Sequence, residues 1–319
     1  MQSTRPAHGT GGLRTGASHF ALIMHLGSPT VIATGFRWAE GPLWVDRLDS
    51  LLVSDVKGNA IWRLTRPASA SGEWRREVFL RPSGSADPHP PSEEPGANGL
   101  ALDAQGRVVL CSHGERGVYV LDEEIWTKRP ILTRFRGHRI NSPNDLALHP
   151  TSGALYVTDP PYGLAGQFDD PRREVPFCAV YRFCKRTGAI AVASDALSAP
   201  NGIAFSPDGR TAYVTNSKPP AGRFVAFDVQ DDGTFGEPRT LLALPEATYE
   251  TGMPDGLAVA ADGTLVGAGP EGLYLFTPDG ALRQQVSVDP LASNIAFGEG
   301  GQAMFATAED RVLRFPVEP

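Results

Sequence analysis

Residues 141–163 have the sequence NSPNDLALHPTSGALYVTDPPYG, and this stretch decides the predicted fold. A polar cluster that includes Asn144 precedes an alternating apolar run at 146–148, a turn at 151–153 and a second apolar run at 155–158. Two short apolar runs on either side of a glycine-containing turn predict a strand, a turn and a second strand. Asn144 therefore lies just before the first strand, where a short, rigid side-chain oxygen can be directed at a fixed point.

Looser copies of this unit recur along the chain, and each has an Asn, Asp or Glu in the place of Asn144. These residues are Glu40, Asn98, Asn201, Asp255 and Asn294. A repeat of roughly 40 to 60 residues with three or four short strands is typical of a β-propeller. We therefore predict an all-β, six-bladed β-propeller in which these side chains converge at one end of the central channel. A β-sandwich, the rival architecture, usually needs fewer residues and does not explain the repeated polar residue.

The predicted propeller spans residues 30–319, and residues 1–29 form an extension rich in Gly, Ser, Thr and Ala that we expect to be flexible. Residues 30–36 precede the first inner strand, so they could supply the outer strand of the last blade and close the ring. The apolar piece at 20–26 is short and contains His25, so a secretory signal is possible but not favoured.

Composition limits the classes of partner. The formal net charge is −7 and the pI is about 5.5, which disfavours a nucleic-acid partner because phosphate binding needs clustered Lys and Arg. No window approaches the roughly 20 apolar residues of a membrane span. We expect a small-molecule substrate and no membrane partner, and the sequence leaves the oligomeric state open.

The three cysteines are predicted to be free thiols. Cys178 and Cys184 flank one apparent strand, and at about 3.3 Å per residue they would lie roughly 20 Å apart, beyond the reach of a disulfide. Free thiols weakly favour a reducing, cytoplasmic location, and a secreted or periplasmic location stays open.

Two insertions interrupt the repeat. Residues 81–96 contain five prolines and lead directly to Asn98, and residues 164–174 lie between strands of the third unit. Both are expected to project from a mouth of the channel, where such loops either shape a pocket or are simply solvated.

The converging residues predict a metal site. Amide and carboxylate oxygens suit a hard cation such as Ca²⁺, which accepts six to eight oxygen ligands. Mg²⁺, Mn²⁺ or Zn²⁺ are alternatives. A single Asn-Gly or Asp-Gly pair is also a standard turn former, so the prediction depends on the recurrence of these residues at one register.

Several motifs together resemble the gluconolactonase branch of the senescence marker protein/gluconolactonase/luciferin-regenerating family, from about residue 30 to the C-terminus. They are AEGPLW at 39–44, CSHG at 111–114, NSPND at 141–145, TDPPYG at 158–163, PNG at 200–202, SPDG at 206–209 and PDG at 254–256. The resemblance implies a six-bladed propeller with a divalent metal in its channel. It also implies that the enzyme hydrolyses a lactone or a related ester.

The resemblance further implies roles for individual residues. Glu40, Asn201 and Asp255 would bind the metal directly, and Asn144 matches a position that binds it directly or through water. Asn98, Asn144 and Tyr162 are expected to contact substrate, whereas Asn294 is expected to be structural. Asp255 is the preferred general base and His113 is the alternative, because imidazole titrates near neutral pH.

Two other functions remain open at this point. The same metal site could hydrolyse phosphotriesters or aryl esters, which related propellers do. Alternatively, the protein could be a non-enzymatic Ca²⁺-binding propeller or interaction scaffold. A scaffold, however, has no need for carboxylates and amides that converge on one point.

Overall fold

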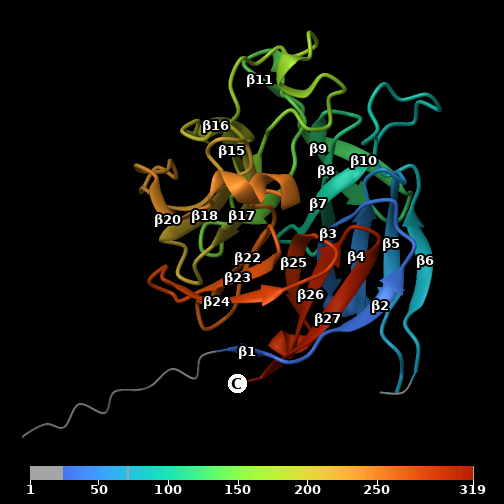
Figure 1. Ribbon diagram of the computed structural model, residues 1–319. Helices are drawn as coiled ribbons and strands as arrows, with labels where there is room; N and C mark the ends of the chain where they lie inside the picture. The colour runs from blue at the N-terminus through green and yellow to red at the C-terminus, as the bar shows by residue number, and fades with distance from the viewer. Residues whose placement is uncertain (1–23, 70–71, 319) are drawn as a thin grey trace, which may run out of the picture.

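The computed structural model describes residues 24–69 and 72–318, and over these residues the chain forms β-strands and short 3₁₀ helices (Figure 1). The 3₁₀ helices are η1 (Asp46–Leu48), η2 (Gln167–Asp169), η3 (Glu246–Thr251) and η4 (Glu299–Gly301). A two-stranded hairpin consists of β11 (Arg134–Phe135) and β12 (His138–Arg139). No helix in these residues has the length and apolar character that crossing a membrane requires.

The other strands form six antiparallel sheets, and in the first five the strands follow one another in chain order. The first sheet contains β3 (Ala39–Val45), β4 (Ser50–Asp55), β5 (Ala60–Thr65) and β6 (Arg75–Leu80). The second contains β7 (Ala97–Leu102), β8 (Val108–Ser112), β9 (Gly117–Asp122) and β10 (Thr127–Leu132). The third contains β13 (Leu146–Leu148), β14 (Leu155–Thr158), β15 (Val180–Cys184) and β16 (Ala189–Ser194).

The fourth sheet contains β17 (Pro200–Phe205), β18 (Thr211–Asn216), β19 (Arg223–Asp228) and β20 (Arg239–Ala243). The fifth contains β21 (Leu257–Val259), β22 (Leu265–Gly269), β23 (Gly272–Phe276) and β24 (Leu282–Ser287). The sixth contains β25 (Ala292–Gly298), β26 (Ala303–Ala308) and β27 (Arg311–Glu318), with β1 (His25–Leu26) and β2 (Thr30–Thr34) paired to β27.

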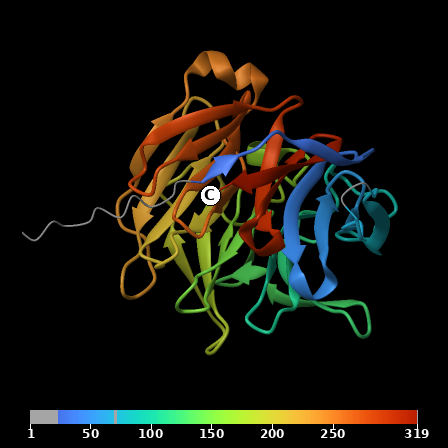
Figure 2. The same cartoon turned by 90° about the horizontal axis from the view of Figure 1, so that it is seen from below.

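The first strand of each sheet contacts the first strand of the next sheet, and β25 contacts β3. The six sheets are therefore blades around a central axis, as Figures 1 and 2 show. This confirms the predicted six-bladed β-propeller.

The N-terminal segment closes the ring. Strand β2 pairs antiparallel with β27, so blue N-terminal chain lies beside red C-terminal chain in Figure 1. The prediction that residues 30–36 supply this outer strand is confirmed, because β2 begins at Thr30. Contacts start earlier than expected, since Met24 is buried and His25 pairs with Glu318. The rest of the predicted extension, residues 1–23, lies outside the described residues.

The core lies between adjacent blades because each sheet packs on both faces. Every residue of β4 is buried, for example, and six hydrophobic clusters each bridge two neighbouring blades. Between the last blade and the first, Trp44 stacks on Phe305 with ring centroids 5.5 Å apart. The cysteines Cys111, Cys178 and Cys184 are free, as predicted.

Candidate functional site

The predicted site residues lie at the start of the inner strands, as the sequence repeat indicated. Glu40, Asn98 and Asn201 occupy the second positions of β3, β7 and β17, and Asn144 and Asp255 lie two residues before β13 and β21. Glu40, Asn98, Asn144 and Asn201 are buried, with exposed fractions of 4 to 6%, and Asp255 is partly exposed. All six blades therefore present a polar residue to the same end of the channel, with Asn294 of β25 as the sixth.

The glycines after these residues allow the inner strands to approach one another. A Cβ atom on Gly202 would lie 2.3 Å from the backbone oxygen of Asp255, and one on Gly256 would lie 2.2 Å from Oδ1 of Asn294. Such distances leave no room for a side chain. The turn interpretation of the Asn-Gly pairs is thus wrong here, because Asn98-Gly99 and Asn201-Gly202 lie inside strands and their glycines permit close packing around the channel.

Hydroxyl groups on the second strands hold the backbone of the next blade in place. Ser54 donates to the backbone oxygen of Asn98 at 2.6 Å. Thr158 donates to that of Asn201 at 2.6 Å, and Thr215 to that of Asp255 at 2.7 Å. The sequence motifs did not indicate this set, although Ser54, Thr158 and Thr215 share a register, each being the last or next-to-last residue of its second strand.

The channel end is strongly acidic. Burial, followed by the negative charges of Asp255 and Asp145, raises the pKa of Glu40 well above its usual value. Burial and the charge of Asp145 likewise raise the pKa of Asp255, while a hydrogen bond from Asn201 opposes this. Asp145, which our sequence analysis did not select, is itself buried, and burial raises its pKa to about 7. Asp145 therefore disfavours the ionisation of both Glu40 and Asp255, and Asp255 disfavours that of Glu40.

Two amide oxygens at this end have no hydrogen-bond partner. Oδ1 of Asn98 and Oδ1 of Asn201 are both buried and unpaired. A buried carbonyl oxygen without a donor is costly, so these atoms are available to a ligand. Within residues 24–69 and 72–318, no group of three His, Cys, Asp or Glu side chains is placed to hold a metal by itself. An ion bound here would consequently need amide oxygens as well as carboxylates.

His113 lies beside this ring. Its ring is fully buried, and Nδ2 of Asn98 lies 3.4 Å from its Nε2 atom. In the first and third blades, the residue that follows the hydroxyl-bearing residue of the second strand is an aspartate, Asp55 or Asp159. Both carboxylates accept hydrogen bonds from backbone N–H groups of their own blade. Only in the second blade is this position a histidine that contacts a channel residue.

The structure places Tyr162 near the site with its hydroxyl already paired. The hydroxyl donates to the backbone oxygen of Ser217 at 2.7 Å, and the ring packs edge-on against Phe168 of the second insertion. Burial, with the charge of Asp255 as the next cause, raises the pKa of Tyr162. Tyr162 thus contributes a wall and holds the insertion, while its oxygen has no free donor for a substrate.

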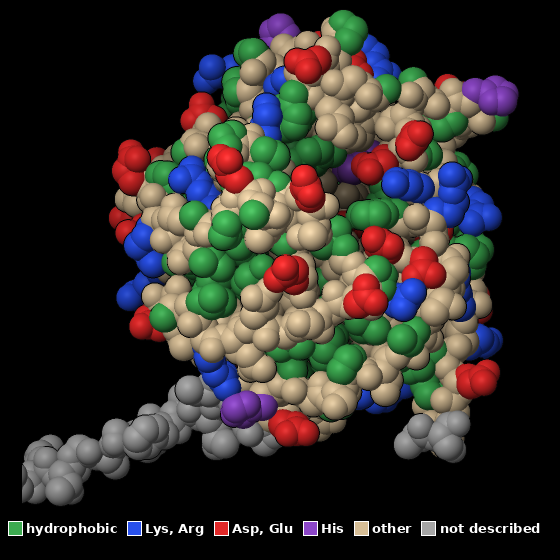
Figure 3. Space-filling model, in the orientation of Figure 1, with side chains coloured by type: hydrophobic (Ala, Val, Ile, Leu, Met, Phe, Trp, Pro, Cys, Tyr) green, Lys and Arg blue, Asp and Glu red, His purple; other side chains and the backbone are tan. Residues whose placement is uncertain are grey.

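The arginines of the second insertion are occupied by contacts within the insertion and with Asn141. Arg172 binds both carboxylate oxygens of Asp170, and Arg173 donates to the backbone oxygen of Phe168 and to Oδ1 of Asn141. These contacts shape the insertion itself. Figure 3 shows a hollow on the face seen there, with histidine and acidic side chains visible at its wall and rim.

Comparison with known proteins shows the family to which this fold belongs. The profile of the SMP-30/Gluconolactonase/LRE-like region matches residues 38–309. A gluconolactonase of Zymomonas mobilis is 35% identical over 92% of this chain and 82% of its own length. A solved structure described as a gluconolactonase of Xanthomonas campestris is 28% identical over 91% of this chain and 89% of its own, with a TM-score of 0.77.

A more distant structure shares the fold alone. Regucalcin of Agrobacterium tumefaciens, described as a calcium-binding protein, is 19% identical over 90% of this chain and 93% of its own, with a TM-score of 0.69. The matched profile includes strands of all six blades, and the relatives span nearly the whole chain. This protein therefore belongs to the SMP-30/gluconolactonase/LRE-like family.

Proposed function

We propose that this protein is a lactonase that opens a sugar lactone of the gluconolactone type and that a divalent metal ion, Ca²⁺ in the first place, is its cofactor. The family membership and the Zymomonas and Xanthomonas gluconolactonases support the reaction class. The acidic channel end, with its unpaired amide oxygens, supports the metal.

The residues present fit a hard cation. Glu40 and Asp255 are desolvated, and the neighbouring charges that act on their pKa are those of other carboxyl groups, which raise it. Carboxylates in such a place are costly without a compensating cation. The single observation that supports the metal most strongly is Oδ1 of Asn201, a buried oxygen without a partner beside the acidic Asp255. Glu40, Asn144, Asn201 and Asp255 would hold the ion, since all offer the oxygens that Ca²⁺ prefers.

A bound divalent cation polarises a carbonyl group and stabilises negative charge on its oxygen. The protein's own groups must orient the lactone and accept a proton from the attacking water. Asn98 has a free amide oxygen that can accept a hydrogen bond from a sugar hydroxyl. Asn144 and Tyr162 would complete the wall around the substrate.

Two groups can act as general base, Asp255 and His113. A carboxylate that also binds a cation is a weakened base, because the positive charge favours its ionised form. His113 contacts Asn98 rather than a proposed metal ligand, so its Nε2 atom is free of that constraint. This contact supports His113 as the proposed base, in place of the sequence-based preference for Asp255.

A substrate panel tests this proposal. Purified protein is stripped of metal, reloaded separately with Ca²⁺, Mg²⁺, Mn²⁺ or Zn²⁺, and assayed on gluconolactone, an aryl ester and a phosphotriester. We expect gluconolactone to be hydrolysed fastest and only after reloading. A higher kcat/KM on the phosphotriester or aryl ester would favour the second function class, and no turnover with any ion would favour a binding propeller.

A further inference from the structure

We propose that Glu94, carried on the proline-rich insertion at residues 81–96, is a positioning residue that orients His113 for proton transfer. The inference deepens the proposed lactonase function and rests on it. It assigns a purpose to an insertion whose sequence predicts only a loop.

Glu94 is the carboxylate that faces the ring of His113. Its Oε2 atom lies 3.2 Å from Nδ1 of His113, at an angle too oblique for an aligned hydrogen bond. The histidine ring is fully buried, whereas the Glu94 side chain keeps 29% of its surface exposed. The contact therefore joins a buried imidazole to a partly exposed carboxylate on a surface loop.

The contact at the opposite edge of the ring, at Nε2, determines which ring nitrogen can accept a proton. The Asn98 amide is oriented with its nitrogen toward Nε2 of His113, and this nitrogen can only donate, so we infer that Nε2 accepts and that the ring proton lies on Nδ1, toward Glu94. A carboxylate at Nδ1 holds this tautomer and stabilises the imidazolium that forms when Nε2 takes a proton. Nε2 is also the nitrogen on the side of Asn98, the residue with the free channel oxygen.

The proton balance is complete without another reactant. Nε2 of His113 gives up the long contact with the Asn98 amide and takes a proton from water as the water oxygen bonds to the lactone carbonyl carbon. The ring C–O bond then breaks, and the imidazolium returns the proton to the departing ring oxygen. The product is the open hydroxy acid, and Glu94 remains ionised throughout.

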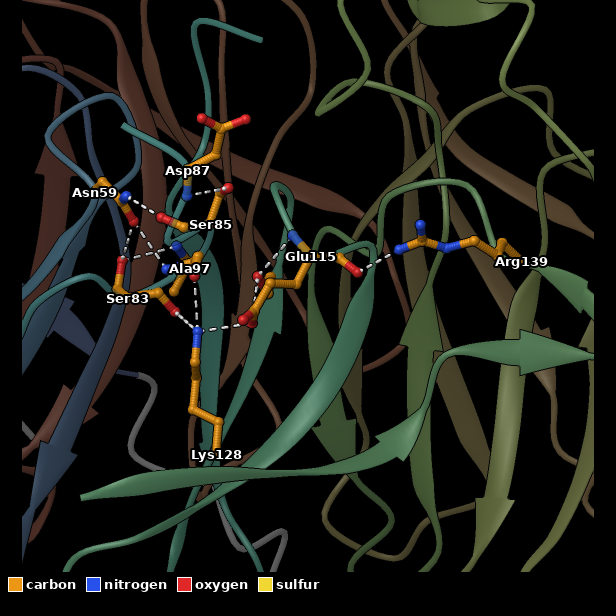
Figure 4. A network of polar contacts seen from close by, with 10 residues as sticks. Asn59, Ser83, Ser85, Asp87, Ala97, Glu115, Lys128 and Arg139 are labelled. Carbon is orange, nitrogen blue, oxygen red and sulfur yellow. Dashed lines mark hydrogen bonds and ion pairs between the residues drawn. The ribbon is translucent and has the colours of Figure 1, made fainter. Parts of the chain in front are cut away.

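The insertion is anchored so that Glu94 has a defined place. Figure 4 shows Lys128 at the centre of the anchor. Its Nζ atom donates to the backbone oxygens of Ser83 and Gly84 at 3.0 and 2.8 Å and to Oε2 of Glu115 at 2.6 Å. Ser83 and Gly84 belong to the insertion, and Glu115 lies two residues after His113. One partly buried ammonium group thus joins the loop that bears Glu94 to the turn that bears His113.

The two ends of the insertion are also tied to each other. The backbone N–H of Ser85 donates to the oxygen of Pro95 at 2.9 Å, and Ser83 Oγ accepts from the N–H of Ala97 at 3.0 Å. Asn59 holds the same segment, accepting from Gly84 N–H and donating to the oxygen of Ser85, both at 2.8 Å. Glu94 is therefore presented by a closed loop of fixed geometry rather than by a solvated tail.

The test compares Glu94→Gln with Glu93→Gln, its exposed neighbour on the same loop, which loses the same charge. Both changes are made in the native chain and in a His113→Asn background, and kcat and KM are measured on gluconolactone with Ca²⁺ present. We expect Glu94→Gln to lower kcat about 10- to 100-fold with little change in KM, within the range for acid–base catalysis. Glu93→Gln should have no effect, and Glu94→Asp should recover part of the loss.

The double variant decides between positioning and a general charge effect. If Glu94 acts through His113, Glu94→Gln should cost nothing further in the His113→Asn background. An equal loss in both backgrounds, or no loss in the native chain, would overturn the proposal.

A second readout is independent of turnover. Nitrogen-15 NMR of the His113 ring, identified by its absence in His113→Asn, should show the proton on Nδ1 in the native chain and a mixture of tautomers in Glu94→Gln. An unchanged tautomer would overturn the proposal. An inactive native protein with the expected NMR change would instead refute the proposed function and leave the Glu94–His113 contact intact.

Discussion

One position at the end of the second strand has a different role in the second blade than in the first and third blades. It is His113 in the second blade, and Asp55 and Asp159 in the first and third. Asp55 and Asp159 turn back onto their own blades, where each accepts backbone N–H groups, as in the 2.7 Å bond from Asn141 N–H to Asp159. His113 contacts Asn98 in the channel and Glu94 of the insertion. His113 therefore does not share the structural role of Asp55 and Asp159, and we infer a different function for this position of the second blade. The predictions below test this contrast.

Removal of a proposed metal ligand should have the largest effect. Glu40→Gln and Asp255→Asn are each expected to lower kcat/KM on gluconolactone by at least about 100-fold, the scale seen when charge stabilisation at a developing oxyanion is lost. Because both native carboxyl groups are desolvated, the neutral amides should not destabilise the metal-free protein. Circular dichroism melts in EDTA provide the control, and normal turnover by either variant would contradict the assigned metal site.

Changing His113 should separate activity from stability. His113→Gln is expected to lower kcat about 100-fold or more, because proton transfer by a positioned side chain contributes at least that much. The free energy of unfolding should change little, since the ring has no aligned hydrogen bond other than the long one to Asn98. Steady-state kinetics and urea unfolding on the same preparation check both parts. An active but unstable variant would place His113 among the structural residues.

The matching change in the first blade should give the opposite result. Asp55 accepts from the backbone N–H groups of Arg37, Trp38 and Gly58 at 3.0 to 3.1 Å. Asp55→Ala leaves these donors without that partner, so we expect a loss of about 2–3 kcal/mol in the free energy of unfolding. The kcat of the folded fraction should stay within a factor of about three, an expectation that follows from the separation of stability and catalytic effects. If Asp55→Ala impaired kcat as His113→Gln does, the contrast between the blades would fail.

The pH dependence of stability should be smaller but diagnostic. Burial raises the pKa of Asp159 to about 7, against about 3.9 in an unfolded chain, and the pKa of Glu40 and Asp255 also rises. The stability that Asp159 contributes is fully present below about pH 4 and is lost as the pH rises through about 7, and the raised pKa of Glu40 and of Asp255 acts in the same direction. Metal-free protein should therefore melt at a lower temperature at pH 8 than at pH 5.

Calcium should reverse part of this loss. A cation binds the ionised carboxylates, so the increase in melting temperature on adding Ca²⁺ should be larger at pH 8 than at pH 5. At 100 times the dissociation constant the stabilisation is about 2.7 kcal/mol. Thermal unfolding in EDTA and in Ca²⁺ at both pH values measures it. Equal increments would show that the acidic cluster is not where Ca²⁺ binds.

The blades and their order could be predicted from the sequence because each repeat places an Asn, Asp or Glu before an alternating apolar run. The closing strand was also predictable, since residues 30–36 precede the first inner strand. Asp145 could not be selected in the same way. It takes the place of glycine in the third blade, and only the packed channel shows that its carboxyl group lies close enough to affect Glu40.

The contact between Glu94 and His113 was beyond sequence reasoning for a different reason. The two residues lie on a loop and on a strand end, and no periodic pattern relates them. Their approach depends on Lys128, which binds the backbone of the loop and Glu115. A hydrogen bond to a backbone oxygen does not require a particular residue type at the acceptor position, so the sequence does not indicate it.

The most direct test of the central claim is a titration of metal-stripped protein with Ca²⁺, in which bound ion and lactone turnover are measured on the same sample. We predict negligible turnover without the ion and recovery in proportion to Ca²⁺ bound at the channel. Asp255→Asn should lose both the binding and the recovery. Full lactone turnover by protein from which all metal has been removed would contradict the account.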